Sequence, residues 1–228
     1  MEEIITIEQK VKRKKAPFII GVIILVFAII GVVNIVGFVK DAVKPQDDES
    51  AQLQEYAQFL TWVVGVDPAS FSDITSANKD DLRNIAICSL MNDGVTTSTY
   101  TVSEKGLTVP ASDVELYYYS MFGQDTSIVH ANVVGYGYEF AYDAANGVYY
   151  VPLTGVTPPF SVRVESAKVT GDFIQLRVGY VGTSNVEIDA QGNLKSAQPD
   201  KYADVTLKKT ENGYNLISLM AVTVGEYN

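Results

Sequence analysis

The stretch FSVRVESAKVTGDFIQLRVGY, residues 160–180, decides the fold class of this chain. In both of its halves apolar side chains alternate with polar ones, which is the period of a strand with one buried face. Between the halves, Thr170, Gly171 and Asp172 have the composition of a tight turn. Two such strands joined by a tight turn predict an antiparallel hairpin. Its inward side chains are Phe160, Val162, Val164, Ile174, Leu176, Val178 and Tyr180.

The same pattern continues on both sides of this hairpin. A strand from Val134 to Tyr142 is predicted to turn its alternate side chains inward, and residues 143–147 then turn the chain into a strand at 148–153. Two last strands, 202–209 and 214–222, flank a turn at 211–213, and residues 99–102 and 107–109 predict a short hairpin. Neighbouring hairpins make the sheet antiparallel, which excludes a doubly wound nucleotide-binding fold. The inward residues of the first strand are Val134, Tyr136, Tyr138, Phe140 and Tyr142.

Three amphipathic helices are expected besides these strands. The first begins near Ser50 and stops at Gly65 and Pro68, and the second begins near Ser76 or Asn78. The third has the capping-box spacing in residues 112–115 and a glycine stop at position 123. The fold class is therefore α+β, with about three helices packed on one curved antiparallel sheet. The expected core includes Leu60, Leu82, Ile85, Leu116, Phe140, Val162, Leu176 and Leu216.

Composition narrows the function classes. The chain has 228 residues, 47% of them hydrophobic and 19% charged, which is typical of one globular domain. It has a single cysteine, Cys88, and a single histidine, His130, so an intramolecular disulfide and the usual Cys/His zinc sites are excluded. Its 27 acidic and 17 basic side chains give a net charge of −10, which repels nucleic acid. We expect no metal, no cofactor and no nucleic-acid partner.

Residues 16–39, APFIIGVIILVFAIIGVVNIVGFV, carry no charge and predict a membrane helix, which would span roughly 36 Å. A core helix would keep a polar stripe, and a cleaved signal peptide would have a shorter apolar run. Basic residues crowd the segment before position 16, so the N-terminus is predicted to be cytoplasmic and the chain to cross the plasma membrane once. The expected organisation is a tail at 1–15, a span at 16–39, a linker at 40–49 and an outer domain at 50–228.

The order of elements resembles that of a known family. Two helices, a short hairpin, a third helix and then several long strands resemble the NTF2-like (cystatin-like) fold. Together with the short tail and the single span, the chain resembles the VirB8-type assembly subunits of bacterial conjugation and secretion machines. This resemblance implies an envelope protein with an NTF2-like outer domain, and it carries over no functional residue because it contains no diagnostic motif.

Candidate binding residues come from the non-core positions of the strands. Glu139, Arg163, Glu165 and Arg177 occupy such positions and are predicted to share one face, where Gly135 and Gly137 leave room for a ligand. The alternative is a solvent-exposed ladder of charges that contributes little stability. Tyr118 lies partly off the buried stripe of the third helix and is the candidate for a partner surface.

Other chemistry-bearing residues have simpler interpretations. Cys88 is expected to be a buried, inert thiol on the second helix, and His130 to lie in a loop after the third. Residues 189–193, DAQGN, resemble a calcium loop but lack its distal Glu, so a turn is preferred. The many tyrosines between positions 117 and 150 could line a pocket, although strand and helix periodicity places most of them in the core.

Three functions fit these observations. The first is a non-catalytic, membrane-anchored binding or scaffold subunit of a bacterial envelope complex, with an envelope protein or a second copy as partner. The second is an extracytoplasmic sensor that holds a ligand or cell-wall fragment on the concave face of the sheet. The third is a cell-wall hydrolase that uses Glu139 or Glu165 together with a second carboxylate in an open cleft.

Overall fold

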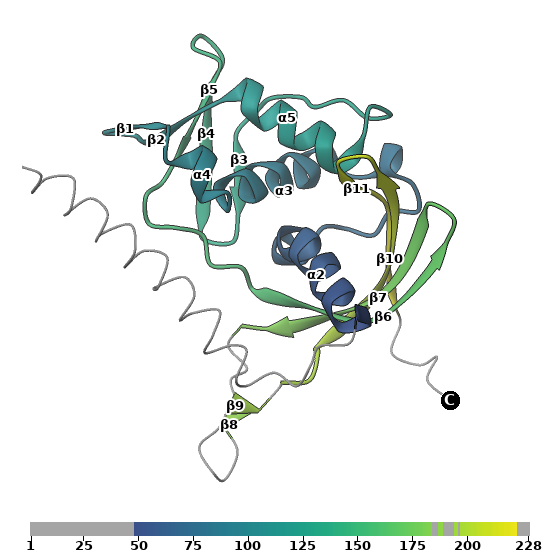
Figure 1. The fold of residues 1–228 in the computed structure, drawn as a ribbon. Helices are drawn as coiled ribbons and strands as arrows, with labels where there is room; N and C mark the ends of the chain where they lie inside the picture. Colours follow the sequence, from purple (N-terminus) through teal and green to yellow (C-terminus); the bar gives the residue numbers. More distant parts are fainter. Residues whose placement is uncertain (1–47, 184–186, 189–193, 196, 223–228) are drawn as a thin grey trace, which may run out of the picture. The chain divides into compact units, whose positions relative to one another are not determined.

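A computed structural model describes residues 48–183, 187–188, 194–195 and 197–222. The chain divides into two compact units, Met1–Asp48 and Glu49–Asn228, and all described residues but Asp48 belong to the second. The second unit is an α+β domain in which helices pack against antiparallel sheets (Figure 1). The predicted membrane helix at 16–39 lies outside the described residues. Within those residues, no helix combines the length and the hydrophobicity needed to span a membrane.

Helix α2, Asp48–Val66, is the first described element. It ends where the sequence predicts, because Asp67 takes a positive φ of 55° and Pro68 cannot continue the helix hydrogen bonds. Its buried stripe contains Tyr56, Leu60 and Val64. In Figure 1 the helix lies inside the curve of the strands β6 (Phe160–Thr170), β7 (Phe173–Gly182) and β10 (Lys201–Thr210). Its C-terminal end is held there by Lys201, whose Nζ lies 2.6 Å from each carboxylate oxygen of Asp67.

Helices α3, Lys79–Met91, and α5, Ala111–Phe122, pack against each other. Asn78 caps α3 as expected, its side chain accepting a hydrogen bond from the Asp80 N–H at 2.8 Å. The capping-box prediction for α5 was wrong: the helix begins at Ala111, directly after strand β2, so Ser112 already lies inside it. Gly123 ends α5 with a φ of 76°, as predicted. Two short elements were not predicted, the 3-10 turn η1, Ile74–Ser76, and α4, Gly94–Thr97.

The strands form two main sheets rather than the single sheet expected. The first has the order β1-β2-β5-β4-β3, with the predicted hairpin of β1, Thr101–Ser103, and β2, Gly106–Pro110, at one edge. Strand β5, Val148–Val151, pairs with β2 and with β4. The segment after β5, PLTGVTPP, explains the division. Its three prolines cannot donate ladder hydrogen bonds, so the chain leaves this sheet before β6 begins.

The strand predicted from Val134 to Tyr142 is instead a tight hairpin. It consists of β3, Val133–Gly135, and β4, Tyr138–Asp143, which pair antiparallel. Gly137 takes a φ of 74° at the turn between them. The turn inverts the expected facing, so Val133 is buried whereas Val134 is 76% exposed. Tyr136, also expected inward, is exposed.

The second sheet has the order β11-β10-β7-β6. It consists of β6, Phe160–Thr170, β7, Phe173–Gly182, β10, Lys201–Thr210, and β11, Gly213–Val222, all antiparallel. The hairpin predicted from residues 160–180 is confirmed. Its inward side chains on β7 belong to the core with those of β10, so this face of the sheet is covered. The buried residues are Ile174, Leu176, Val178, Tyr180, Ala203, Val205 and Leu207.

The core differs from expectation at one position in particular. Leu116, expected inside, is 70% exposed on α5, while Tyr118 two residues later is 0% exposed. The sequence of α5 is apolar or aromatic on several sides, so its periodicity does not select a face. Packing between α5, α3 and β11 selects the side of Tyr118. Leu60, Leu82, Ile85, Phe140, Leu176 and Leu216 are buried as expected, and Val162 is partly buried.

Candidate functional site

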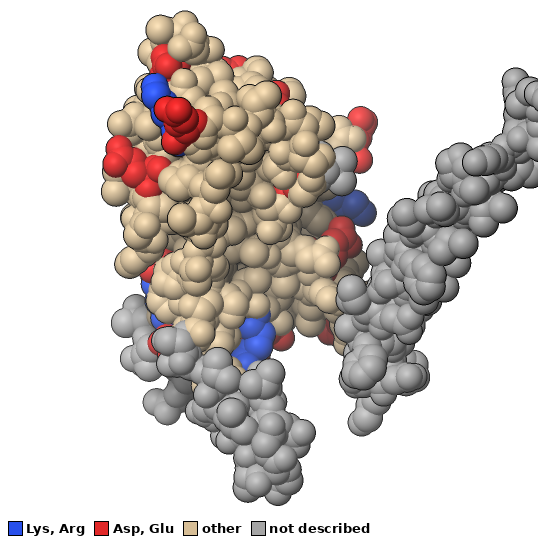
Figure 2. Space-filling model, turned by 90° about the vertical axis from the view of Figure 1, so that its left-hand side faces the viewer, with Lys and Arg blue, Asp and Glu red and all other residues tan. Residues whose placement is uncertain are grey.

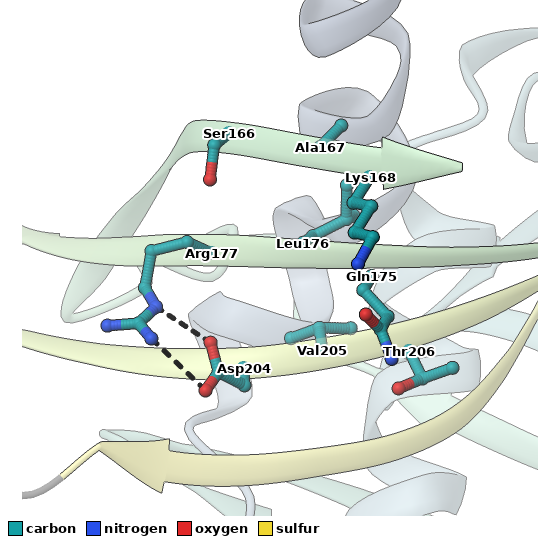
Figure 3. A pocket seen from close by; sticks show the side chains of 9 residues that line it. All are labelled: Ser166, Ala167, Lys168, Gln175, Leu176, Arg177, Asp204, Val205 and Thr206. Atoms are coloured by element: carbon teal, nitrogen blue, oxygen red, sulfur yellow. Dashed lines mark hydrogen bonds and ion pairs between the residues drawn. The ribbon is translucent and has the colours of Figure 1, made fainter. Parts of the chain in front are cut away.

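A polar groove of about 580 Å³ lies on the outer face of the four-stranded sheet (Figure 3). Two rows of side chains cross three strands there, following the strand register. One row is Ser166 on β6, Arg177 on β7 and Asp204 on β10; the other is Lys168, Gln175 and Thr206. We call these six residues the outer groove. It is open to solvent and lies on the opposite face from the buried side chains of β7 and β10.

A β-bulge places the β6 residues in this groove. The register of β6 against β7 shifts between Val164 and Ser166, so that Glu165 has no partner opposite it. Before the bulge the even-numbered residues face inward; after it the odd-numbered Ala167 faces inward opposite Leu176. Ser166 and Lys168 therefore point outward. The sequence signal is the change of phase in VESAKV, residues 164–169, which a uniform alternation overlooks.

The electrostatics of the groove are dominated by one ion pair. The Arg177 guanidinium donates two hydrogen bonds to the Asp204 carboxylate, Nε to Oδ1 at 2.7 Å and Nη2 to Oδ2 at 3.2 Å. These two hydrogen bonds fix the plane of the guanidinium relative to that of the carboxylate. Partly exposed ion pairs contribute only about 0–1 kcal/mol to stability. The rest of the lining supplies hydroxyls, an amide and the Lys168 ammonium. Such groups bind polar chains through hydrogen bonds.

Arg163 and Glu165 lie on the same outer face, at its other end, where the chain covers the sheet. Arg163 donates from Nε to Glu165 Oε1 at 2.7 Å and from Nη1 to the carbonyl of Ala197 at 3.0 Å. Pro199 sits over Gly179, where an added Cβ would lie 2.6 Å from the proline ring. These two predicted residues therefore hold the 197–199 segment against the sheet.

Glu139 does not share this face, contrary to the prediction. It is exposed on β4 of the five-stranded sheet and accepts a hydrogen bond from Asn132 Nδ2 at 3.3 Å. The room expected at Gly135 is filled, because the Tyr138 ring folds directly over it. Gly137 serves the hairpin turn instead. The two carboxylates proposed for hydrolysis, Glu139 and Glu165, are thus placed on different sheets, and Glu165 is paired with Arg163.

Tyr118, expected on a partner surface, is part of the core. Its hydroxyl lies 3.1 Å from Thr126 Oγ1 and donates to the Ser127 carbonyl at 3.2 Å. Burial raises the pKa of its phenol. Its ring makes an edge-on contact with Phe122, the centroids lying 5.0 Å apart. Tyr118 therefore anchors the segment that follows α5 and is unavailable to a partner.

His130 lies in a loop, as predicted, but in a network that the sequence did not reveal. Its Nε2 lies 2.8 Å from Glu115 Oε1 and its Nδ1 lies 2.8 Å from the Tyr149 hydroxyl. An ionised carboxylate only accepts hydrogen bonds, so Nε2 donates and, in the neutral ring, Nδ1 accepts from Tyr149. Burial raises the pKa of Tyr149 to about 12. The network ties α5 and β5 to the loop that contains His130. The Tyr149 hydroxyl in this network is fully buried.

Cys88 lies on α3 and is 1% exposed. Burial raises the pKa of its thiol to about 12, so the reactive thiolate is scarce at neutral pH. We therefore expect a membrane-impermeant maleimide to label Cys88 only after denaturation. Mass spectrometry of the native and the urea-treated protein checks this. Rapid labelling of the native protein would contradict the buried position.

Two predictions remain, the turn at 189–193 and a ligand site on the concave face of the sheet. The 189–193 segment is among the residues not described, and the strands β8, Glu187–Ile188, and β9, Leu194–Lys195, pair on either side of it. The concave side of the four-stranded sheet, which the sensor hypothesis assigns to a ligand, is filled by side chains such as Leu176 and Val205, each at most 2% exposed.

Comparisons with protein-family models, with curated proteins and with solved structures gave no match for this chain. Its function is therefore inferred from its own residues and geometry. These define an α+β domain with two main antiparallel sheets and a polar outer groove built around the Arg177–Asp204 ion pair.

Proposed function

We propose that this chain is a membrane-anchored, non-catalytic binding or scaffold subunit of a bacterial envelope complex, with its α+β domain outside the plasma membrane. The observation that carries the proposal is the charge-free segment 16–39 with basic residues crowded before it. The folded part of the protein would therefore act outside the membrane.

The order of described elements supports the proposed likeness to VirB8-type subunits. Helices α2 and α3 come first, then the β1–β2 hairpin, then α5, and the long strands follow. The short helix α4 and the division into two sheets depart from the single curved sheet on which the likeness was based. We propose an NTF2-like ancestry on the order of elements alone, without transferring any residue's role.

The outer groove is the surface proposed for the partner. It has two rows of hydrogen-bonding groups across the sheet, and one of its two cationic groups, the Arg177 guanidinium, is already balanced by Asp204. Such a surface suits a polar segment of another protein. A hydrolase is not favoured, because Glu139 and Glu165 are held apart on different sheets.

Site-specific crosslinking in intact cells tests this proposal. A photo-reactive amino acid at Gln175, in the outer groove, is expected to capture an envelope protein or a second copy. The same group at Ser112, exposed on α5, serves as the matched control and is expected to capture far less. Recovery of only the monomer from both positions would contradict the proposed role.

The topology is tested separately. Protease added to protoplasts is expected to digest the chain beyond about Lys44 and to spare the tail before residue 16, since the positive-inside rule places that tail in the cytoplasm. Antibodies against each end report which fragments survive. A protected C-terminal domain would reverse the orientation.

A further inference from the structure

Two hollows of about 250 and 240 Å³ share the Trp62 side chain in their walls. Both are lined by Trp62 of α2 and by Asn92 at the end of α3. One extends toward the start of β11, and the other toward the segment that joins β5 to β6. Ligand pockets have volumes from roughly 300 Å³ upward, and each hollow is slightly smaller than that. Each therefore has room for a single ring.

The lining of both hollows is uncharged. Aromatic rings, sulfur atoms, aliphatic groups, amides and hydroxyls form the walls, and none of the described residues that line either hollow is a Lys, Arg, Asp or Glu. A charged ligand would lose its hydration there without a counter-charge. The site therefore selects neutral molecules, in contrast to the net charge of −10 of the chain.

The second hollow is largely apolar and continues an apolar surface. Cys88, Met91, Val151 and Val156 are among its walls, and sulfur atoms make favourable contacts with aromatic rings. Val151 pairs with Leu107, which pairs with Val102, so one apolar row runs from the hollow to the sheet edge. On the side of α4 and the β5–β6 segment, Figure 2 shows a face whose middle is almost free of charged side chains.

Trp62 contributes an unsatisfied hydrogen-bond donor. A Cβ added at Gly65 would lie 3.2 Å from Trp62 Cε3 and 2.9 Å from Pro158 Cβ, so the six-membered ring of the indole is closely held on that side. The indole Nε1 is on the opposite edge, is buried, and has no hydrogen-bond partner among the described residues. A buried donor without an acceptor costs free energy, and an acceptor on a ligand would remove that cost.

We propose that the hollows at Trp62 form a binding site for an uncharged aromatic ring that carries a hydrogen-bond acceptor, with the acceptor taking the Trp62 N–H. Neighbouring atoms cover this nitrogen, so part of the wall must move aside for the acceptor to reach it. The wall of the second hollow contains Gly155, whose φ of 74° and exposed position suit a hinge. The site is separate from the outer groove and goes beyond the proposed scaffold role.

The single tryptophan of the chain makes the test direct. Benzamide, an uncharged ring with a carbonyl acceptor, is titrated into the full-length protein while the Trp62 emission is recorded with excitation at about 295 nm. We expect a saturable change in emission. Benzoate has the same ring with a negative charge, and cyclohexanecarboxamide has the same acceptor on a non-planar ring; both are expected to bind at least tenfold more weakly.

Variants identify the site by saturation-transfer NMR of benzamide. Trp62→Phe keeps a ring and removes the N–H, so the Kd is expected to rise about threefold to tenfold, the effect of one neutral hydrogen bond. Val156→Asp places a charge in the hollow and is expected to abolish binding, which keeps the test valid if Trp62→Phe fails to fold. Leu116→Ala, which lines neither hollow, should bind like the parent. The proposal is overturned if emission shows no saturable change, if benzoate binds as well as benzamide, or if Val156→Asp binds normally.

Discussion

Replacing Tyr118 with alanine is expected to lower the free energy of unfolding by about 3–5 kcal/mol, the range for removing a large buried aromatic ring. The ring is 0% exposed, contacts Phe122 and holds Thr126 and Ser127 through its hydroxyl. Tyr118→Phe removes only the hydroxyl and should cost about 1 kcal/mol. These values are measured by unfolding a soluble fragment that begins near residue 47 in urea and monitoring the circular dichroism signal.

Leu116→Ala is the matched control on the same helix. Leu116 is 70% exposed, so its truncation should change the free energy of unfolding by no more than about 0.5 kcal/mol. A large loss for Leu116→Ala with a small loss for Tyr118→Ala would mean that α5 packs with its opposite face. Tyr118 would then become available as the partner surface that the sequence first indicated.

Leu176→Ala is the second substitution with a large expected effect, a loss of about 2–5 kcal/mol. Leu176 is 2% exposed on the inner face of β7, opposite Val205 of β10, so its truncation leaves a cavity in the core. The neighbouring Arg177→Ala should cost under about 1 kcal/mol, because the side chain is 31% exposed and a surface ion pair contributes little. The same urea titration compares the two.

The contrast between these neighbours tests the register of the sheet. A shift of one residue would exchange the two faces of β7 and bring Arg177 into the core. If Arg177→Ala unfolds the domain and Leu176→Ala is tolerated, the outer groove is not on the surface. The crosslinking proposed at Gln175 would fail for the same reason.

Much of the fold could be predicted from local patterns. The hairpins around Gly171, Gly147 and Gly213 follow from turn residues between alternating strands, and the structure confirms all three. The end of α2 and the start of α3 also follow from single residues, Pro68 and Asn78 respectively. These features depend on interactions within a few residues, which the sequence contains in full.

The candidate site was predicted less completely. Arg163 and Arg177 lie on one outer face because strand alternation places them there, and Glu165, at the bulge, is held beside them by its ion pair with Arg163. Glu139 was assigned to the same face only on the assumption of a single sheet. Nothing in the local pattern showed that His130 would meet Glu115 and Tyr149, since these contacts join positions 15 and 19 residues away.

The sequence by itself determined the α+β class, the antiparallel pairing of neighbouring strands and the prediction of a charge-free segment at 16–39, because each depends on periodicity or composition over a short window. The tertiary structure alone decided that the strands form two sheets, that Tyr118 and not Leu116 enters the core, and that a bulge at Glu165 carries Ser166 and Lys168 into the outer groove. The reason is physical: α5 is apolar or aromatic on several sides and the alternation of β6 changes phase, so the buried face is selected by the packing of α5 against α3 and β11 and by the pairing of β6 with β7.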